Sequence, residues 1–164
     1  MTTAGEIEED LNDLAFVHSH MVEMAFLPTA WALAAHSSHM WFEIIFPPAR
    51  REDIPREPGV YAFVVKSELF DFPFACGLFY VGKATSLYER ISSYIGEQNK
   101  RLVDSRRPHV WRMINQWKGH LRYLYTITSD VTAAEDLENK MLSAFRPHFN
   151  HRFEASVSQT MRAF

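Results

Sequence analysis

Three short segments rich in β-branched and aromatic residues constrain this chain to a fold with a small sheet. Residues 59–65 read GVYAFVV, residues 78–82 read LFYVG, and residues 121–129 read LRYLYTITS with clear alternation. Apolar residues at helical spacing occupy the stretches 86–95, 108–118 and 132–145. Strands and helices in this order predict a small mixed α+β domain.

The first fifty residues follow a different pattern, which predicts a helical extension. Apolar residues three and four apart favour a helix over 6–26, and a nearly continuous apolar stretch favours a second helix over 29–45. Two prolines end that second helix. We therefore expect a helical extension over 1–49, a proline-containing linker over 50–57, a main domain over 58–152 and a C-terminal tail over 153–164.

Several function classes are excluded by what the chain lacks. Its 164 residues include a single cysteine, Cys76, so no internal disulfide can form. No apolar run approaches the roughly 18 residues that a membrane-spanning helix needs. The N-terminus is acidic, unlike a secretory signal. We expect a cytoplasmic protein without a membrane partner.

Charge is distributed unevenly along the chain. The formal net charge is -3, yet residues 1–49 contain seven acidic residues and no Lys or Arg. Residues 81–122 contain nine basic and three acidic residues, a local net charge of +6. Such a local field can attract phosphates even when the total charge is negative. Charge alone leaves a second interpretation open, which is an ordinary solvated helix surface.

Five polar residues could together carry out phosphodiester chemistry. Hydrolysis of a phosphodiester needs a group that takes a proton from water, cations that offset the developing negative charge, and a carboxylate that holds a divalent metal ion. Two strand tyrosines, two cations beside a helix start and one mid-helix carboxylate could supply these parts: Tyr61, Tyr80, Lys83, Arg90 and Glu138. Taken singly, each has a simpler interpretation as a packing or surface residue.

The order of these residues resembles the GIY-YIG nuclease family. The string PGVY at 58–61 is followed by FYVGKA at 79–84, and then by Leu87, Arg90 and SSY at 92–94. Leu137-Glu138 and the stretch FRPHFN at 145–150 resemble the family's second half, with Phe149 in place of another aromatic residue. The resemblance covers roughly residues 55–152 and is strongest to the N-terminal nuclease domains of the family's excision-repair members. It implies a three-stranded antiparallel sheet flanked by helices.

The resemblance also implies a role for each matching residue. Tyr61 and Tyr80 match the two motif tyrosines, one of which serves as general base or positions the attacking water, and Lys83 matches a lysine that assists it. Arg90 matches the arginine that offsets negative charge, and Tyr94 lies one turn beyond it. Glu138 matches the sole carboxylate ligand of a divalent ion, Mg²⁺ or Mn²⁺. The last matching position, at the rim of the site, is Asn150.

One departure from the family is the long connection between the two tyrosines. Eighteen residues, 62–79, separate Tyr61 from Tyr80, where the family has about ten. The excess falls in residues 66–77, interpreted as an enlarged hairpin loop. It carries three phenylalanines that could contact a substrate or partner or pack on the N-terminal helices: Phe70, Phe72 and Phe74.

These observations favour a metal-dependent DNA endonuclease of restriction, defence or repair type. A set of basic residues is expected to follow the nucleic-acid backbone: Arg101, Arg106, Arg107, Arg112, Lys118, Arg146 and His148. The alternative is a non-catalytic module that binds nucleic acid or protein on the same scaffold. We also expect a homodimer through the apolar N-terminal helices, whose candidate contacts are Trp31, Trp41 and Phe42.

Overall fold

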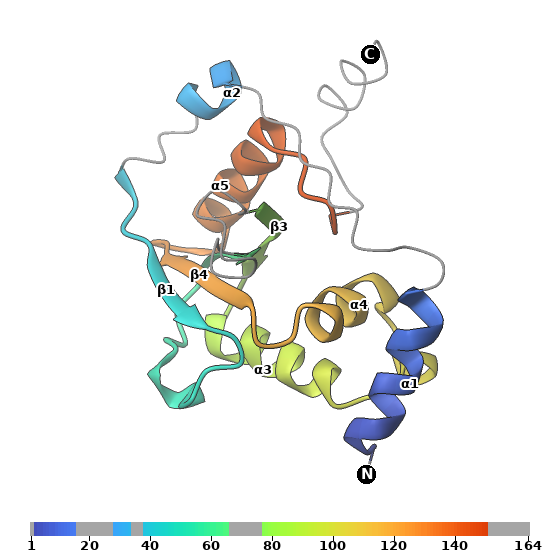
Figure 1. Cartoon of the computed structure of the whole chain (residues 1–164). Helices are drawn as coiled ribbons and strands as arrows, with labels where there is room; N and C mark the ends of the chain where they lie inside the picture. Colours follow the sequence, from blue (N-terminus) through green and yellow to red (C-terminus); the bar gives the residue numbers. More distant parts are fainter. Residues whose placement is uncertain (1, 16–27, 34–37, 66–76, 151–164) are drawn as a thin grey trace.

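The protein is built around one antiparallel sheet with helices on both faces (Figure 1). The computed structural model describes residues 2–15, 28–33, 38–65 and 77–150. Its four strands, in the spatial order β1-β4-β2-β3, are β1 (Phe42–Ile45), β2 (Gly59–Val65), β3 (Gly77–Ala84) and β4 (Leu121–Ile127). The expected α+β class with a small antiparallel sheet is confirmed, although the sheet has four strands where three were predicted.

The three helices expected in the main domain are present within a few residues of their predicted bounds. They are α3 (Leu87–Gln98), α4 (Pro108–Gln116) and α5 (Val131–Ala144). The Ser86 hydroxyl accepts a hydrogen bond from the Glu89 amide at 3.3 Å, which satisfies one of the amides left unpaired at a helix start. The predicted N-cap of α3 is thereby confirmed.

The helix expected over 29–45 is wrong at its C-terminal end. Helix α2 is described over Pro28–Leu33, whereas Phe42–Ile45 is strand β1 and pairs with β4, Phe42 opposite Tyr125. A short apolar run does not by itself distinguish a helix from a strand, and the aromatic and β-branched residues of β1 suit a pleated sheet. The open edge of β4 supplied the hydrogen-bonding partner that local sequence could not reveal.

The helix expected over 6–26 is described only in its first half, as α1 (Ala4–Ala15). Residues 16–27 lie outside the described part of the chain, as do residues 34–37. The same holds for residues 66–76, with Phe70, Phe72 and Phe74, and for the tail 151–164. Within the described residues, none of the helices is both long and apolar enough to cross a bilayer.

The segment expected to be a linker is packed against the body of the domain. Residues Arg51–Asp53 form a short 3-10 helix, and Ile54 is buried in the core. The carbonyl oxygens of Pro55 and Glu57 accept hydrogen bonds from the Tyr88 and Leu87 amides at 2.9 and 3.1 Å. Residues 50–57 therefore hold the start of α3 in place. The domain boundaries themselves stay a prediction.

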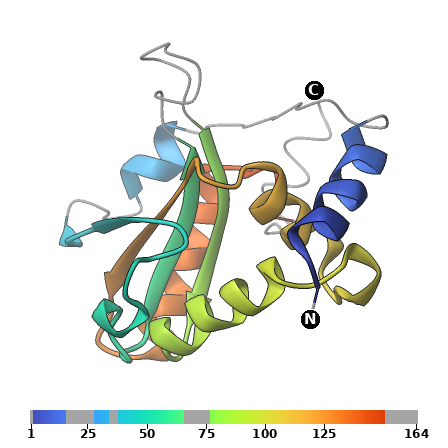
Figure 2. The ribbon, with the colours of Figure 1, turned by 60° about the horizontal axis from the view of Figure 1, so that its bottom comes forward.

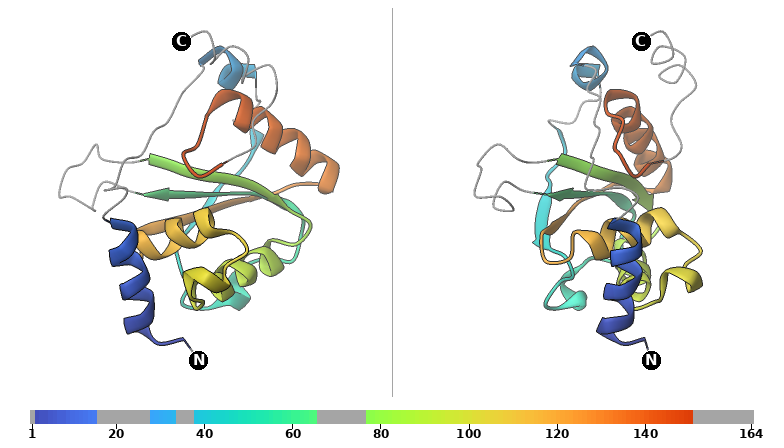
Figure 3. Two further views of the ribbon diagram at one scale, coloured as in Figure 1. Left: turned by 90° about the vertical axis from the view of Figure 1, so that its right-hand side faces the viewer. Right: turned by 45° about the vertical axis from the view of Figure 1, so that its right-hand side comes forward.

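Helices cover both faces of the sheet (Figures 2 and 3), and each face has its own apolar layer. Along β2, Tyr61, Phe63 and Val65 join the larger layer, which contains residues of α3 and α4. Val60 and Ala62 point to the opposite face and pack with residues of α5. Because both faces are covered, β2 reads as a continuous apolar run rather than an alternating one.

Candidate functional site

A stack of tyrosines from four different elements forms the centre of the site. The Tyr61 hydroxyl on β2 lies 2.7 Å from the Tyr94 hydroxyl on α3. The Tyr61 ring also stacks against Tyr80 on β3 and Tyr123 on β4, with ring centroids 6.2 and 5.5 Å apart. The structure thus brings together three tyrosines predicted from the sequence and adds Tyr123, which motif spacing did not indicate.

Two motif glycines are required because neighbouring groups approach their backbone closely. A Cβ atom on Gly82 would lie 2.4 Å from the Tyr61 hydroxyl and 3.0 Å from the Tyr80 ring. A Cβ atom on Gly59 would lie 2.2 Å from the carbonyl oxygen of Thr126. The first glycine therefore lets the Tyr61 ring rest directly on β3, and the second lets β2 pass close to β4.

The tyrosines differ in their access to solvent, and this separates their possible roles. Tyr61 is 1% exposed, and Tyr94 is fully buried. Burial, reinforced by the neighbouring tyrosines, raises the pKa of Tyr61 well above its usual value, and burial also raises the pKa of Tyr94. Both hydroxyls stay protonated at neutral pH. Tyr80 is half-buried, so its side chain reaches solvent.

Arg90 lies half-buried beside this stack. Burial by itself would lower the pKa of Arg90, but the surrounding tyrosine hydroxyls, Tyr61 foremost, outweigh it and raise that pKa. Among the described residues, no carboxylate lies within ion-pair distance of the Arg90 guanidinium. The positive charge of Arg90 is therefore not neutralised by a direct partner there.

The outer edge of β3 positions the remaining predicted residues. The Asn150 side chain pairs with the Val81 backbone, accepting from its amide at 2.9 Å and donating to its carbonyl at 2.8 Å. Glu138 on α5 accepts a hydrogen bond from the Lys83 amide at 3.0 Å. Residues 81 and 83 point their backbone groups to the same side of the strand. Glu138 and Asn150 therefore lie along one strand edge, beside Gly82.

Glu138 has the properties of a single-carboxylate metal ligand. It is half-buried, and this burial raises its pKa even though Lys83 acts in the opposite direction. Its Oε1 atom accepts from the Lys83 amide, while the described residues provide no hydrogen bond to Oε2. Within the described residues, no group of three His, Cys, Asp or Glu side chains could hold a metal ion. A cation held here would need water or substrate oxygens to complete its shell.

The sequence analysis missed Glu135, which contacts a predicted site residue directly. The Lys83 ammonium lies 2.5 Å from Glu135 Oε1, while the Lys83 amide donates to Glu138. The two carboxylates are three residues apart on α5, a spacing that puts them on one helix face. That spacing relative to Glu138 was the available signal in the sequence.

The residues predicted to bind nucleic acid fall into four groups. The Arg107 guanidinium lies 4.9 Å from the centre of the Tyr94 ring, and that of Arg112 lies 5.6 Å from the Phe149 ring. Arg106 and Lys118 are exposed, whereas Arg146 and His148 are half-buried near Asn150 in the chain. Arg101 is bound by carboxylates of α1. Nucleic-acid binding by these residues stays a prediction.

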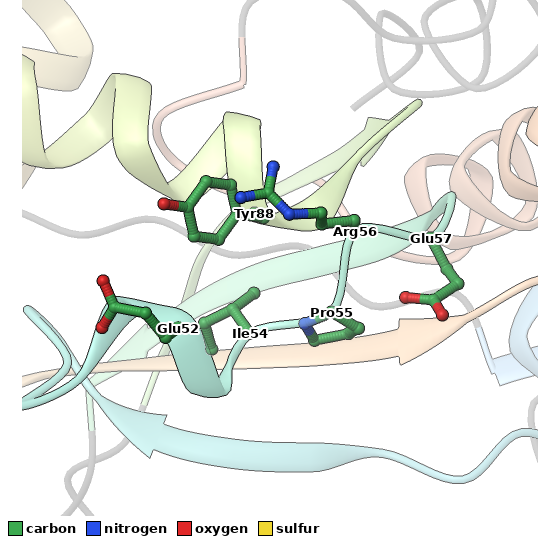
Figure 4. A pocket seen from close by; sticks show the side chains of 6 residues that line it. All are labelled: Glu52, Ile54, Pro55, Arg56, Glu57 and Tyr88. Carbon is green, nitrogen blue, oxygen red and sulfur yellow. The ribbon is translucent and has the colours of Figure 1, made fainter.

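A hollow of about 410 Å³ lies on another side of α3 (Figure 4). Its lining consists of Glu52, Ile54, Pro55, Arg56, Glu57 and Tyr88. The Arg56 guanidinium covers the Tyr88 ring at 3.8 Å from its centre and pairs with Glu89 at 3.1 Å. Because carboxylates outnumber guanidinium groups in this lining, the hollow gives phosphate no net electrostatic attraction. It shares no residue with the tyrosine stack.

Comparison with known proteins gives one family match and several relatives. The model of the UvrC-like GIY-YIG domain matches residues 57–151. The UvrABC system protein C of Helicobacter hepaticus is 30% identical over 101 residues, and that of Nautilia profundicola is 29% identical over 99 residues. Each alignment covers 60% of this chain and 14% of the relative.

Among solved structures, the chain is similar to the GIY-YIG N-terminal endonuclease domain of UvrC from Thermotoga maritima bound to magnesium, its catalytic divalent cation. The sequence identity is 24%, and the TM-score is 0.44. The superposition covers 61% of this chain and 90% of the other.

Proposed function

The chain belongs to the UvrC-like GIY-YIG family, and on this basis we propose that it is a metal-dependent endonuclease that hydrolyses DNA phosphodiester bonds in excision repair. The observation that carries the proposal is that Tyr80 and Lys83 of β3, Arg90 of α3 and Glu138 of α5 lie close together. The matched stretch spans 14% of the length of the relatives. Their names refer to the UvrABC system, and nothing in them supports the restriction or defence setting.

Tyr80 is the better candidate for the group that receives the proton of the attacking water. Tyr61 is buried, its hydroxyl is bonded to Tyr94, and its pKa is raised well above the usual value. Tyr80 stacks on Tyr61 from the solvent-accessible side of the pair. A general base must reach the proton that it takes, directly or through one water molecule. Tyr61 then serves to hold Tyr80 in place.

Arg90 is suited to offset the negative charge that develops on the phosphate. Its guanidinium is held among tyrosine side chains, and no described carboxylate neutralises it. A preorganised cation in a partly desolvated site stabilises a transition state more than a mobile surface cation does. Lys83, whose ammonium is bound by Glu135, would provide a second positive charge at the same strand edge.

Glu138 would hold the metal ion, either Mg²⁺ or Mn²⁺. A half-buried carboxylate with one oxygen left open fits a hard cation that prefers oxygen ligands. When bound, the ion would polarise a phosphoryl oxygen and stabilise the charge on the leaving oxygen. The Asn150 side chain pairs with the Val81 backbone and so occupies the neighbouring position on the same edge of β3.

DNA is the proposed partner, and the basic residues beside the site are its proposed contacts. Arg107 and Arg112 support this assignment best, because each lies against an aromatic residue of the site region.

A cytoplasmic location is compatible with this function and stays a prediction. The homodimer has no support in the structure or in the relatives; light scattering on the purified protein would test it.

A plasmid-nicking assay with Mg²⁺ tests the proposal. Glu138→Gln should reduce cleavage by about 100-fold or more, because the metal ion loses its proposed carboxylate ligand. Asp136→Asn is the matched control, since Asp136 lies on the same helix, is exposed and pairs with Lys140. Equal cleavage by the wild-type protein and Glu138→Gln would contradict the assigned site. If the wild-type protein cleaves neither duplex nor branched nor single-stranded DNA, the non-catalytic binding module becomes the better interpretation.

A further inference from the structure

The acidic helix α1 is bound to the rest of the molecule through one arginine. Asp10 Oδ2 accepts from Arg101 Nε at 2.8 Å, and Asp10 Oδ1 accepts from the Arg101 terminal nitrogen at 2.7 Å. The Leu102 amide also donates to Asp10 Oδ2, at 2.9 Å. Both oxygens of one carboxylate are therefore held by the fork of a guanidinium, which is the geometry by which Arg also binds a phosphate.

More negative charge surrounds Arg101 than a single guanidinium can neutralise. Besides Asp10, Glu6 lies 3.5 Å and Glu9 lies 3.9 Å from its terminal nitrogens. The hydrogen bonds to Arg101 lower the pKa of Asp10 to about 2, so this carboxylate is ionised at neutral pH. Arg101 therefore faces three acidic side chains of α1. Several negative charges near one guanidinium resemble the surroundings that a phosphate backbone provides.

Among the side chains that the structure describes, α1 is attached to the domain by ion pairs and partly buried apolar residues, with no fully buried side chain. None of the side chains described in α1 is buried; the apolar Ile7 and Leu11 are only half-buried. Figures 2 and 3 show α1 lying beside α4, next to the turn that follows α3. Ion pairs near a protein surface weaken as salt is added. A polyanion could therefore displace this helix without disrupting the core.

Arg101 is within reach of a duplex bound at the tyrosine stack. It lies three residues beyond the end of α3, whose first turns carry Arg90, and the eight helical steps from Arg90 to Gln98 alone correspond to roughly 12 Å at about 1.5 Å per residue. A duplex rises about 3.4 Å per base pair, so this helical stretch corresponds to roughly four base pairs. A duplex that places one phosphate at Arg90 and runs along α3 would reach Arg101.

We propose that Arg101 binds a backbone phosphate of DNA and that α1 occupies this contact until DNA displaces it. The proposal rests on the proposed function for the identity of the ligand. It adds an interaction surface outside the tyrosine stack and gives the acidic N-terminal segment a role as an internal competitor of the substrate. Residues 2–15 precede the part of the chain that matches the family model.

Binding of a fluorescein-labelled duplex of about 20 base pairs, measured by anisotropy in EDTA at low salt, tests the proposal. Asp10→Asn should tighten the dissociation constant by about 5- to 10-fold, because Arg101 is released. Glu8→Gln is the matched control: Glu8 is on the same helix and exposed, and it forms no ion pair with a described residue. Removal of this charge should change the dissociation constant by less than about 2-fold.

A second pair of variants separates competition from a general charge effect. Arg101→Ala should abolish the gain when it is combined with Asp10→Asn, because the released contact is then missing. The double variant Glu6→Gln, Glu9→Gln repeats the test without touching the bidentate pair, and should give a smaller gain. Thermal unfolding of every variant checks that the fold is intact.

Two results would overturn the inference: equal gains for Asp10→Asn and Glu8→Gln, or a gain that survives Arg101→Ala. Absence of duplex binding by every variant would overturn it as well. Because binding is measured without metal, it is independent of cleavage. If no variant cleaves DNA but Asp10→Asn shows the Arg101-dependent gain, the proposed function fails and the competition stands.

Discussion

Two arginines near opposite ends of α3 face very different surroundings. Arg90, in the first turns of the helix, is half-buried among tyrosine hydroxyls, and the described residues give it no carboxylate partner. Arg101, just beyond the last turn, is bound by Asp10 and approached by Glu6 and Glu9. The same kind of side chain has no described carboxylate partner at one end and is already neutralised at the other.

This difference shows how a guanidinium acquires a function from what surrounds it. The tyrosines around Arg90 are neutral and do not cancel its charge, so that charge stays available at the site. Carboxylates orient Arg101 and cancel its charge at the same time. The first arrangement keeps the full charge of Arg90 available to the site, whereas a reversible contact is compatible with the second. Four measurements test this contrast and the structure around it.

The largest expected difference is between Arg90→Lys and Arg101→Lys. Lysine keeps the charge but lacks the planar guanidinium fork, so Arg90→Lys should reduce DNA cleavage by about 100-fold or more. Arg101→Lys should change cleavage by less than about 3-fold, because Arg101 lies outside the tyrosine stack and lysine keeps its positive charge. Single-turnover cleavage rates with saturating protein give the comparison. Similar losses for both variants would mean that the two ends of α3 do not differ in this way.

The next effect concerns the glycine that supports the tyrosine stack. Gly82→Ala would place a Cβ atom 2.4 Å from the Tyr61 hydroxyl, and should lower the free energy of unfolding by about 2 kcal/mol or more. Gly96→Ala, on α3 with no atom within 4 Å of its Cβ position, should raise that free energy by about 0.5–1 kcal/mol. Urea unfolding of both variants measures the difference. Equal stabilities would show that the stack does not rest on β3.

A smaller effect distinguishes the two motif tyrosines. Tyr61→Phe leaves the buried Tyr94 hydroxyl without its partner, and should lower the free energy of unfolding by about 1 kcal/mol. Tyr80→Phe should leave stability within about 0.5 kcal/mol, because Tyr80 is only half-buried, while cleavage is lost. Unfolding and cleavage are measured on both proteins. Retained cleavage in Tyr80→Phe, with loss in Tyr61→Phe, would reverse their assigned roles.

The smallest effect is the pH dependence of the α1 contact. Arg101 lowers the pKa of Asp10 from 3.8 to about 2, so the ion pair stabilises docking above the ordinary pKa and is lost as pH falls toward 2. The NMR signal of the Arg101 Nε–H group should titrate with a midpoint of about 2. A midpoint at the ordinary value of 3.8 would show that Asp10 and Arg101 are not paired in solution.

The main-domain elements could be predicted because their signals are local. Residues 59–65 form β2 with the predicted bounds, and Ser86 caps α3 as expected. The strand Phe42–Ile45 could not be predicted, because its four residues form a strand only by pairing with β4, which lies much later in the chain. Glu135 was overlooked for a similar reason: its importance comes from the position of the Lys83 ammonium rather than from its neighbours in sequence.

The amino-acid sequence was sufficient to establish the family, the order of the elements in the main domain, and the residue types that the chemistry requires. These follow from spacing and side-chain identity, which are properties of the linear chain. The three-dimensional arrangement was needed to establish that Tyr61 is buried while Tyr80 is accessible, that Glu138 and Asn150 share the edge of β3, and that α1 neutralises Arg101. Burial and pairing depend on which distant segments meet, and distance along the chain does not encode that directly.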